Sequence, residues 1–413
     1  MSMGKKKLSR QDQERLQSSI RVNMQQEDPR MYSTREKERL SIGREGQTVL
    51  ILGIALILLF LFSLLCLLDL TFRGFSAAWL LENMTIRAND LIHFFSGAHT
   101  EMGTKFLLSE FAAVLLCGGA LSASGAIYQG VFHNPLASPT LLGVQSGGQL
   151  GQAIFSLYFI VPGALTVTSY EDRAAILAGQ SIFEIYAGQL FVFAGCLLAV
   201  AVVVTVSRIA GKGKVNTVAL LLAGTVFSGI VETVISVLKY TQSAYNPGSV
   251  AESAISSVQQ TSFSSVSHPV LLGMMAAPIL LCMLLSILMR NRINLLAFGE
   301  TEAKTMGVNT SRSRLFLIII STIMTASVIS FCGQIAFVGL IAAILARRLT
   351  GPDFRFLLPA SILLGALMLL IAFDVTYMIG SIVDTSSVMS IIGGIFFMII
   401  MTMNRRKRNA SWA

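Results

Sequence analysis

The sequence predicts an all-α polytopic membrane protein with about ten transmembrane helices and both termini in the cytoplasm. Of its 413 residues, 54% are hydrophobic and 13% are charged, whereas a soluble globular chain carries roughly 25% charged residues. The hydrophobic residues also come in long runs, and a helix of about 20 such residues crosses a bilayer. These observations exclude a disordered, collagen-like or disulfide-rich protein and argue against a soluble enzyme.

Ten apolar runs define the predicted spans. The eighth is short, and its alternative is fusion with the seventh through Gly333. A fused helix of 32 residues would be about 48 Å long, which exceeds a hydrocarbon core of about 30 Å, so two separate helices are expected. The predicted spans are residues 49–70, 107–130, 141–161, 188–209, 217–238, 270–288, 315–331, 335–346, 356–374 and 388–403.

The basic residues predict the orientation, because the cytoplasmic loops of membrane proteins are enriched in Lys and Arg. With both termini inside, 26 of the 31 Lys and Arg residues lie in cytoplasmic segments and 5 lie outside. Fusion of the seventh and eighth spans would move the basic C-terminal end outside, which is a second reason to reject it. The cytoplasmic segments are then the N-terminal tail, 131–140, 207–216, 289–314, 347–355 and the C-terminal tail.

Composition along the chain predicts three regions. Residues 1–46 are polar, with 11 basic and 7 acidic side chains. We expect a cytoplasmic and mostly disordered tail there, with a partly helical stretch around residues 11–26 as the alternative. No cleavage site follows the first apolar run, so the first span is expected to remain. Residues 47–404 form the transmembrane domain, with its cytoplasmic loop 289–314, and residues 405–413 form a basic tail.

Histidine and cysteine usage predicts no metal site. The chain has four His and five Cys, without a CxxC or HExxH spacing, and the cysteines all lie inside apolar runs, where they are expected to be small buried hydrophobic side chains. The net charge of +9 is concentrated in the loops and tails, which suits a membrane protein and predicts no nucleic-acid partner. The cysteines are Cys66, Cys117, Cys196, Cys282 and Cys332.

Residues 118–151 join a helix rich in small residues to a second, glycine-rich helix through a break that contains prolines. Small residues let membrane helices approach closely, and Asn134-Pro135 predicts a turn. Each glycine alone is typical of ordinary helix packing. As a whole, the stretch closely resembles the signature of FecCD-type permeases, the membrane subunits of ABC importers for iron–siderophore, haem and vitamin B12. The signature positions are Gly125, Gln129, Asn134, Pro135, Leu136, Pro139, Gly143, Gly147 and Gly148.

A second resemblance lies in the cytoplasmic loop, at residues 294–308. Acidic residues in the first turn and Lys304 further on suit the dipole of a short helix that starts at Glu300, and Gly307 is expected to end it. On local grounds alone a capped connector helix is an equal alternative. In the family, this position is the coupling helix that docks in a cleft of the cytoplasmic ATPase. The resemblance therefore implies the coupling residues Leu295, Leu296, Phe298, Gly299, Glu300, Ala303 and Gly307.

The resemblance extends from about residue 49 to residue 403, with departures that bear on substrate and binding-protein docking. The family's V-P-H after G-L-I is replaced by residues 342–344, its outer R-x-P-R motif is missing before the second span, and its E-L-P-x-G motif is replaced by residues 384–388. Further matches lie at residues 220–224, 333–341, 346–347, 351–353 and 357–359.

Glu232 is the only charged side chain well inside a predicted span. A charged residue within a bilayer is a functional hypothesis by default. The fifth span lines the translocation path in the family, so the resemblance implies path positions at Gly224, Ser228 and Glu232. A pairing of Glu232 with a polar group at a helix contact is an equal alternative.

The resemblance implies a permease subunit that moves an iron chelate, either a siderophore or haem, across the bacterial plasma membrane by alternating access at a permease dimer interface. A corrinoid importer of the vitamin B12 type is the alternative within the family. The chain has no G-x-x-x-x-G-K-[ST] motif, so it is expected not to be an enzyme and to bind no cofactor, with ATP and Mg²⁺ on a partner ATPase.

The further expected partners are a second permease, identical or paralogous, an extracellular or periplasmic substrate-binding protein, and membrane lipid. From the residues alone, a secondary transporter or an intramembrane enzyme stays open. The first would need intramembrane ions or a proton relay, for which Glu232 is the single candidate, and the second would need a nucleophile–base pair, which the spans do not offer.

Overall fold

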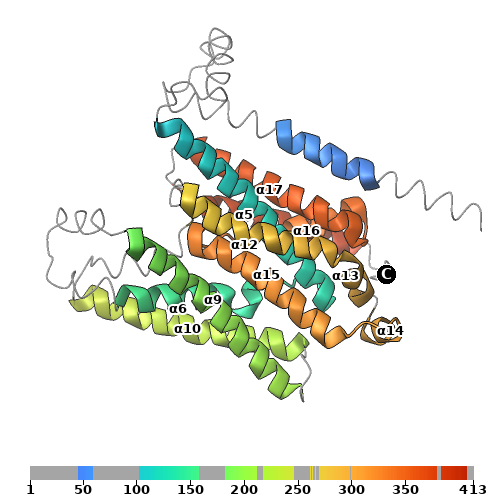
Figure 1. Cartoon of the computed structure of the whole chain (residues 1–413), viewed down its shortest axis with the longest axis horizontal. Coiled ribbons are helices and arrows are strands. Elements are labelled where there is room, and N and C mark those ends of the chain that lie inside the picture. Colours follow the sequence, from blue (N-terminus) through green and yellow to red (C-terminus); the bar gives the residue numbers. More distant parts are fainter. Residues whose placement is uncertain are drawn as a thin grey trace, which may run out of the picture. The chain divides into compact units, whose positions relative to one another are not determined.

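A computed structural model describes residues 45–58, 102–157, 182–211, 217–245, 261, 263, 266, 269–297, 299–378 and 383–406. All regular elements among these residues are helices (Figure 1), which confirms the all-α prediction. The chain divides into the units Met1–Thr48 and Val49–Ala413, and the second holds all the labelled helices discussed below. The predictions for the tail around residues 11–26, for residues 59–70, for Phe298 and for residues 407–413 lie outside the described residues.

Helix α5 (Met102–Phe132) is the central helix of the transmembrane unit. In its apolar stretch, 83% of the residues are buried. Glycines make this possible, because a Cβ atom at Gly118 would lie 2.8 Å from the Cα of Ala366 and would collide with the Gly365 carbonyl. The backbones of α5 and its neighbour can therefore touch. Five α-helices pack on α5: α12 (Pro269–Leu288), α13 (Arg290–Ala297), α15 (Thr310–Cys332), α16 (Val338–Thr350) and α17 (Phe354–Met378).

Buried hydroxyl groups join α5 to α15. The Ser124 hydroxyl donates to the Ser321 carbonyl oxygen at 3.0 Å and lies 3.1 Å from the Thr325 hydroxyl. The Tyr128 hydroxyl lies 3.3 Å from that of Thr322. Such polar contacts between membrane helices contribute where lipid offers no partner, so they fix the register of the two helices.

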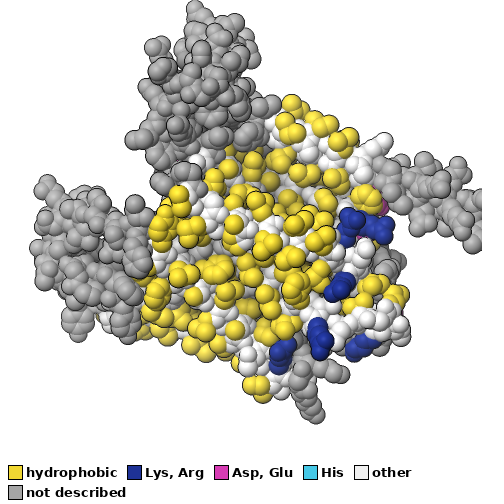
Figure 2. Space-filling model, viewed as in Figure 1, with side chains coloured by type: hydrophobic (Ala, Val, Ile, Leu, Met, Phe, Trp, Pro, Cys, Tyr) yellow, Lys and Arg dark blue, Asp and Glu magenta, His cyan; other side chains and the backbone are white. Residues whose placement is uncertain are grey.

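A second group of helices packs on the other side of α15 (Figure 1). Gly147 of α6 faces Gly195 of α9, and a Cβ on either would collide with the other's carbonyl oxygen. The outermost helix of this group, α10, has only 22% of its apolar stretch buried. Figure 2 shows a broad hydrophobic face with Lys and Arg gathered at the end where α13 and α14 lie. The three helices are α6 (Val144–Phe155), α9 (Ile182–Ala210) and α10 (Thr217–Tyr245).

Six of the described helices are long and apolar enough to cross a membrane: α5, α9, α10, α12, α15 and α17. Two shorter apolar helices are Glu45–Leu58 and Thr385–Ile399, the latter within α18 (Thr385–Arg406). Helices α15 and α16 are separate, which confirms the rejection of a fused seventh span.

The eighth predicted span is a half-length helix. Helix α16 has 13 residues and is therefore about 20 Å long, short of a hydrocarbon core of about 30 Å. It follows a connector, residues 333–337, that begins partway along α5, because the Cys332 sulfur lies 3.5 Å from that of Cys117. Phe337 at the start of α16 has a φ of 64°, a left-handed conformation that is uncommon for a bulky residue.

Candidate functional site: the cytoplasmic loop and the signature turn

The cytoplasmic loop contains two short helices, α13 (Arg290–Ala297) and α14 (Glu300–Thr305). The first was not predicted. It continues from α12 through a backbone bond from Ile293 N to the Met289 carbonyl oxygen, and it is anchored by the buried side chains of Ile293 and Leu296. The second helix begins at Glu300, as predicted. Gly299 precedes it with a φ of 128°.

Helix α14 ends in a glycine cap, as predicted. Gly307 has a φ of 81°, and its N–H donates to the Lys304 carbonyl oxygen at 3.0 Å, while Val308 N–H donates to that of Ala303 at 3.0 Å. This pair of bonds is the Schellman motif. Ala303 is fully buried, whereas Met306 is 58% exposed. The end of the helix is therefore fixed by the glycine cap. The face with Ala303 packs against the protein, whereas Met306 is accessible to a partner.

The signature turn follows α5. The Asn134 side-chain oxygen accepts from Leu136 N–H at 3.0 Å, and its carbonyl oxygen accepts from Ala137 N–H at 3.1 Å, so the predicted turn is confirmed. Pro139 opens the 3₁₀ helix η1 (Pro139–Leu142), and Gly143, with a φ of 73°, leads into α6.

Helix α10 lies against this turn. Gly224 is buried beneath the Leu141 carbonyl oxygen, and a Cβ atom at Gly143 would lie 3.3 Å from the Ser228 hydroxyl. Two of the three predicted path residues thus meet the signature turn. Glu232, one turn further along α10, is exposed in this single chain. An exposed position in one chain suits both a role in the translocation path and a role in helix packing, so both roles of Glu232 stay predictions.

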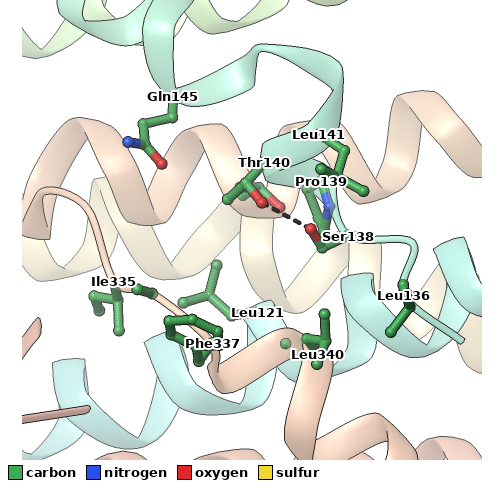
Figure 3. A pocket seen from close by; sticks show the side chains of 13 residues that line it. Leu121, Leu136, Ser138, Pro139, Thr140, Leu141, Gln145, Ile335, Phe337 and Leu340 are labelled. Carbon is green, nitrogen blue, oxygen red and sulfur yellow. Dashed lines mark hydrogen bonds between the residues drawn. The ribbon is translucent and has the colours of Figure 1, made fainter. Parts of the chain in front are cut away.

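A cavity of about 280 Å³ lies between the signature turn and the connector from α15 to α16 (Figure 3). Its walls are mostly apolar, with Ser138, Thr140 and Gln145 among the polar residues, and the Ser138 and Thr140 hydroxyls are 2.7 Å apart. Nearby, Gln129 of the signature donates from its side-chain amide to the Leu340 carbonyl oxygen at 3.1 Å. The signature therefore ties α5 to the first turn of α16.

A polar contact joins α13 to the corner between α16 and α17. The Asn294 amide nitrogen donates to Asp353 Oδ1 at 2.7 Å, and Phe354 N–H donates to Asn294 Oδ1 at 2.8 Å. On the same corner, the Arg347 guanidinium lies 5.8 Å from the centre of the Phe354 ring, and burial lowers the pKa of Arg347. Asn294 and Asp353 lie in the matched stretches 294–308 and 351–353, but no contact between them was predicted. Asp after Gly-Pro and before an apolar run is a helix-start signal.

The predicted residues form two sites. The signature residues lie on α5, on the turn with η1 and on α6, and Gly224 and Ser228 of α10 meet them at η1 and α6. The described coupling residues lie on α13 and α14 or directly beside α14. Among the described residues, no group of three or more His, Cys, Asp or Glu side chains could hold a metal ion. The described residues therefore form a polytopic helical membrane domain with closely packed helices and a short exposed helix, α14.

Comparison with known proteins identifies the family. The FecCD transport family matches residues 56–403, and the chain therefore belongs to that family. It is a multi-pass membrane permease subunit of the ABC importer class, as the sequence resemblance predicted.

Two relatives and one solved structure show which transporters the chain resembles. The chain is 29% identical to the hemin transport system permease protein HmuU of Yersinia pestis, over 73% of this chain and 83% of that protein. It is 31% identical to the cobalamin import system permease protein BtuC of Halobacterium salinarum, over 69% of each. An inward-facing metal-chelate type ABC transporter shares the fold, with a TM-score of 0.64 and 24% identity over 86% of this chain and 99% of that one.

Proposed function

We propose that the chain is a permease subunit that imports an iron chelate, either a siderophore or haem, across the bacterial plasma membrane. The observation that carries this proposal is the family match over residues 56–403, together with a relative named for hemin transport. The metal-chelate type of the structural relative agrees with the same substrate class.

Energy for transport comes from a partner in this proposal. ATP and Mg²⁺ bind a cytoplasmic ABC ATPase, since the 413 residues hold no phosphate-binding loop motif. Helix α14 docks in a cleft of that ATPase. Its support is geometric: the helix is short, capped by Gly307, and exposed at Glu302, Lys304 and Met306. No cofactor on this chain is needed.

The substrate passes between two permeases that alternate between outward-open and inward-open states. The broad exposed face of α10 supports a second permease, identical or paralogous, on that side. Glu232 then faces the path and meets water when the path opens, while Gly224 and Ser228 hold α10 to the signature turn. A substrate-binding protein delivers the chelate from outside.

The alternative is a corrinoid importer, which the relative named for cobalamin import supports. Uptake assays separate the two. The permease is reconstituted with its ATPase and binding protein in proteoliposomes, and ATP-dependent uptake of hemin, a ferric hydroxamate, ferric citrate and cobalamin is compared. We expect saturable uptake of an iron chelate. Uptake of cobalamin alone would overturn the iron assignment, and uptake of none with ATP present would overturn the proposed function.

A further inference from the structure

A reciprocal side-chain contact links the docking loop to the membrane core. Asn294 of α13 donates to Asp353 at 2.7 Å and accepts from Phe354 N–H at 2.8 Å. Because the amide is used as donor and acceptor at once, the contact fixes orientation as well as distance. The hydrogen bond to a carboxylate is also of the stronger, charge-assisted kind.

Asp353 is itself part of the rigid first turn of α17. Its Oδ1 accepts from Arg355 N–H at 2.9 Å, and its carbonyl oxygen accepts from Leu357 N–H at 2.9 Å. This is the geometry of a helix N-cap. A displacement of Asp353 therefore moves the start of α17 with it.

The two ends of the contact lead to α14 and to α5. On the loop side, Gly299 N–H donates to the Leu296 carbonyl oxygen and Ala303 N–H to that of Gly299, so hydrogen bonds run from α13 into α14. On the membrane side, α17 meets α5 at Gly365 and Gly118, where the backbones already touch. Packed interiors deform little, so the α17 end of the contact is firmly held against α5.

We propose that Asn294 and Asp353 are positioning residues that carry the movement of α14 into α17 and thereby couple ATP hydrolysis to transport. This inference rests on the proposed function, because it assumes that α14 docks on an ATPase. The pair touches no substrate. It acts by making the docking loop and the corner between α16 and α17 move as one body.

A side-chain exchange tests the pair. Asn294→Asp places two carboxylates at hydrogen-bond distance, where like charges repel. The double variant Asn294→Asp with Asp353→Asn restores the contact with donor and acceptor reversed, and the amide introduced at position 353 keeps an oxygen for the helix cap. Asn291→Asp is the matched control, since it makes the same change on an exposed position of α13.

The readouts are the amount of ATPase that co-purifies and the ATP hydrolysed per hemin or other panel compound transported. For Asn294→Asp we expect that ratio to rise about fivefold or more, the scale of a typical coupling between sites. We expect the double variant and the Asn291→Asp control to stay within about twofold of the wild type. If Asn294→Asp fails to assemble, Asn294→Ala takes its place with the same expected rise.

Four results would overturn the proposal. A wild-type ratio in Asn294→Asp shows that the contact is not used. A double variant that assembles and stays uncoupled shows that the two residues do not act as a pair. A variant that assembles poorly but keeps the wild-type ratio shows a structural role alone. A wild-type complex that couples ATP to no compound overturns the proposed function together with this inference.

Discussion

Glycines of the membrane domain differ in what surrounds them. A Cβ atom at Gly125 would collide with the Gly339 carbonyl oxygen, whereas one at Gly229 would meet nothing within 4 Å. The first glycine is therefore required by a backbone contact between α5 and α16, and the second is not. The sequence marked Gly125 as part of the signature, and the structure supplies the reason.

Gly125→Ala should destabilise the permease, because overpacking a filled core costs about 1–3 kcal/mol. Gly229→Ala is the control and should be neutral or slightly stabilising, since Ala favours a helix over Gly by about 1 kcal/mol. The yield of folded protein and the midpoint of thermal unfolding measure both. Equal midpoints for the two variants would contradict the close contact.

Glu232 is predicted to act in the path. A charged side chain at the centre of a membrane helix costs about 2.5–3.5 kcal/mol on insertion scales, so a lipid-facing position is disfavoured. Glu232→Gln should change substrate affinity or turnover while the complex with the ATPase persists. Glu232→Leu should impair transport more than assembly, because an apolar side chain would exclude water from the translocation path.

Transport per assembled complex and the amount of assembled complex, measured on the same preparations, test both Glu232 variants. Leu222→Ile on an exposed part of α10 is the control and should leave both quantities unchanged. The packing alternative predicts poor assembly first, with unchanged transport per complex. That pattern in both variants would remove Glu232 from the path.

At the scale of elements, α14 is defined by its two glycine ends. Gly299 has a φ of 128° and Gly307 a φ of 81°, both of which L side chains rarely adopt. A Cβ atom at Gly299 would also meet the Glu302 carboxylate, while one at Gly307 would meet nothing within 4 Å. The two positions therefore differ in how much space they offer.

Gly299→Leu should uncouple transport from ATP hydrolysis while the permease still inserts, because the entry to α14 would have to change conformation. Gly307→Asn is the control, since Asn tolerates the left-handed region and the site is open. Uptake and ATP hydrolysis are measured in proteoliposomes. Normal uptake by Gly299→Leu would remove α14 from the coupling mechanism.

At the scale of the molecule, a central group around α5 and a second group of α6, α9 and α10 share α15 (Figure 1). The half-length α16 begins inside the first group, beside the signature turn. Basic side chains gather at one end of the hydrophobic face (Figure 2), as expected for the cytoplasmic side of a membrane protein.

Single cysteine substitutions test the predicted orientation of the chain in the membrane. Four native cysteines are buried and should react little, and Cys66→Ser removes the fifth. New cysteines at Arg173 and Glu252 should be labelled by an impermeant thiol reagent added to intact cells, whereas those at Lys212, Lys304 and Lys407 should react only after the cells are opened. Strong labelling at Lys407 from outside would contradict the predicted cytoplasmic C-terminus.

Local sequence determined the class of protein, the approximate limits of the long helices, and the caps at Glu300 and Gly307. Each depends on composition, run length or a turn residue within a few positions, which are local properties of the chain. It also placed the signature turn, because Asn-Pro and Gly act through their own backbone. The unpredicted α13 has only eight residues, too few for the apolar run or the helical periodicity that predicted the longer helices.

Only the tertiary structure decided which helices meet. It brought Gly224 and Ser228 to the signature turn. It placed the end of α15 partway along α5, and it joined Asn294 to Asp353, which are 59 residues apart. Membrane helices that are apolar on all sides carry no stripe that marks their partner. Their contacts are decided by where small residues let backbones touch and where buried polar groups find one another, and both depend on the packed arrangement of the whole domain.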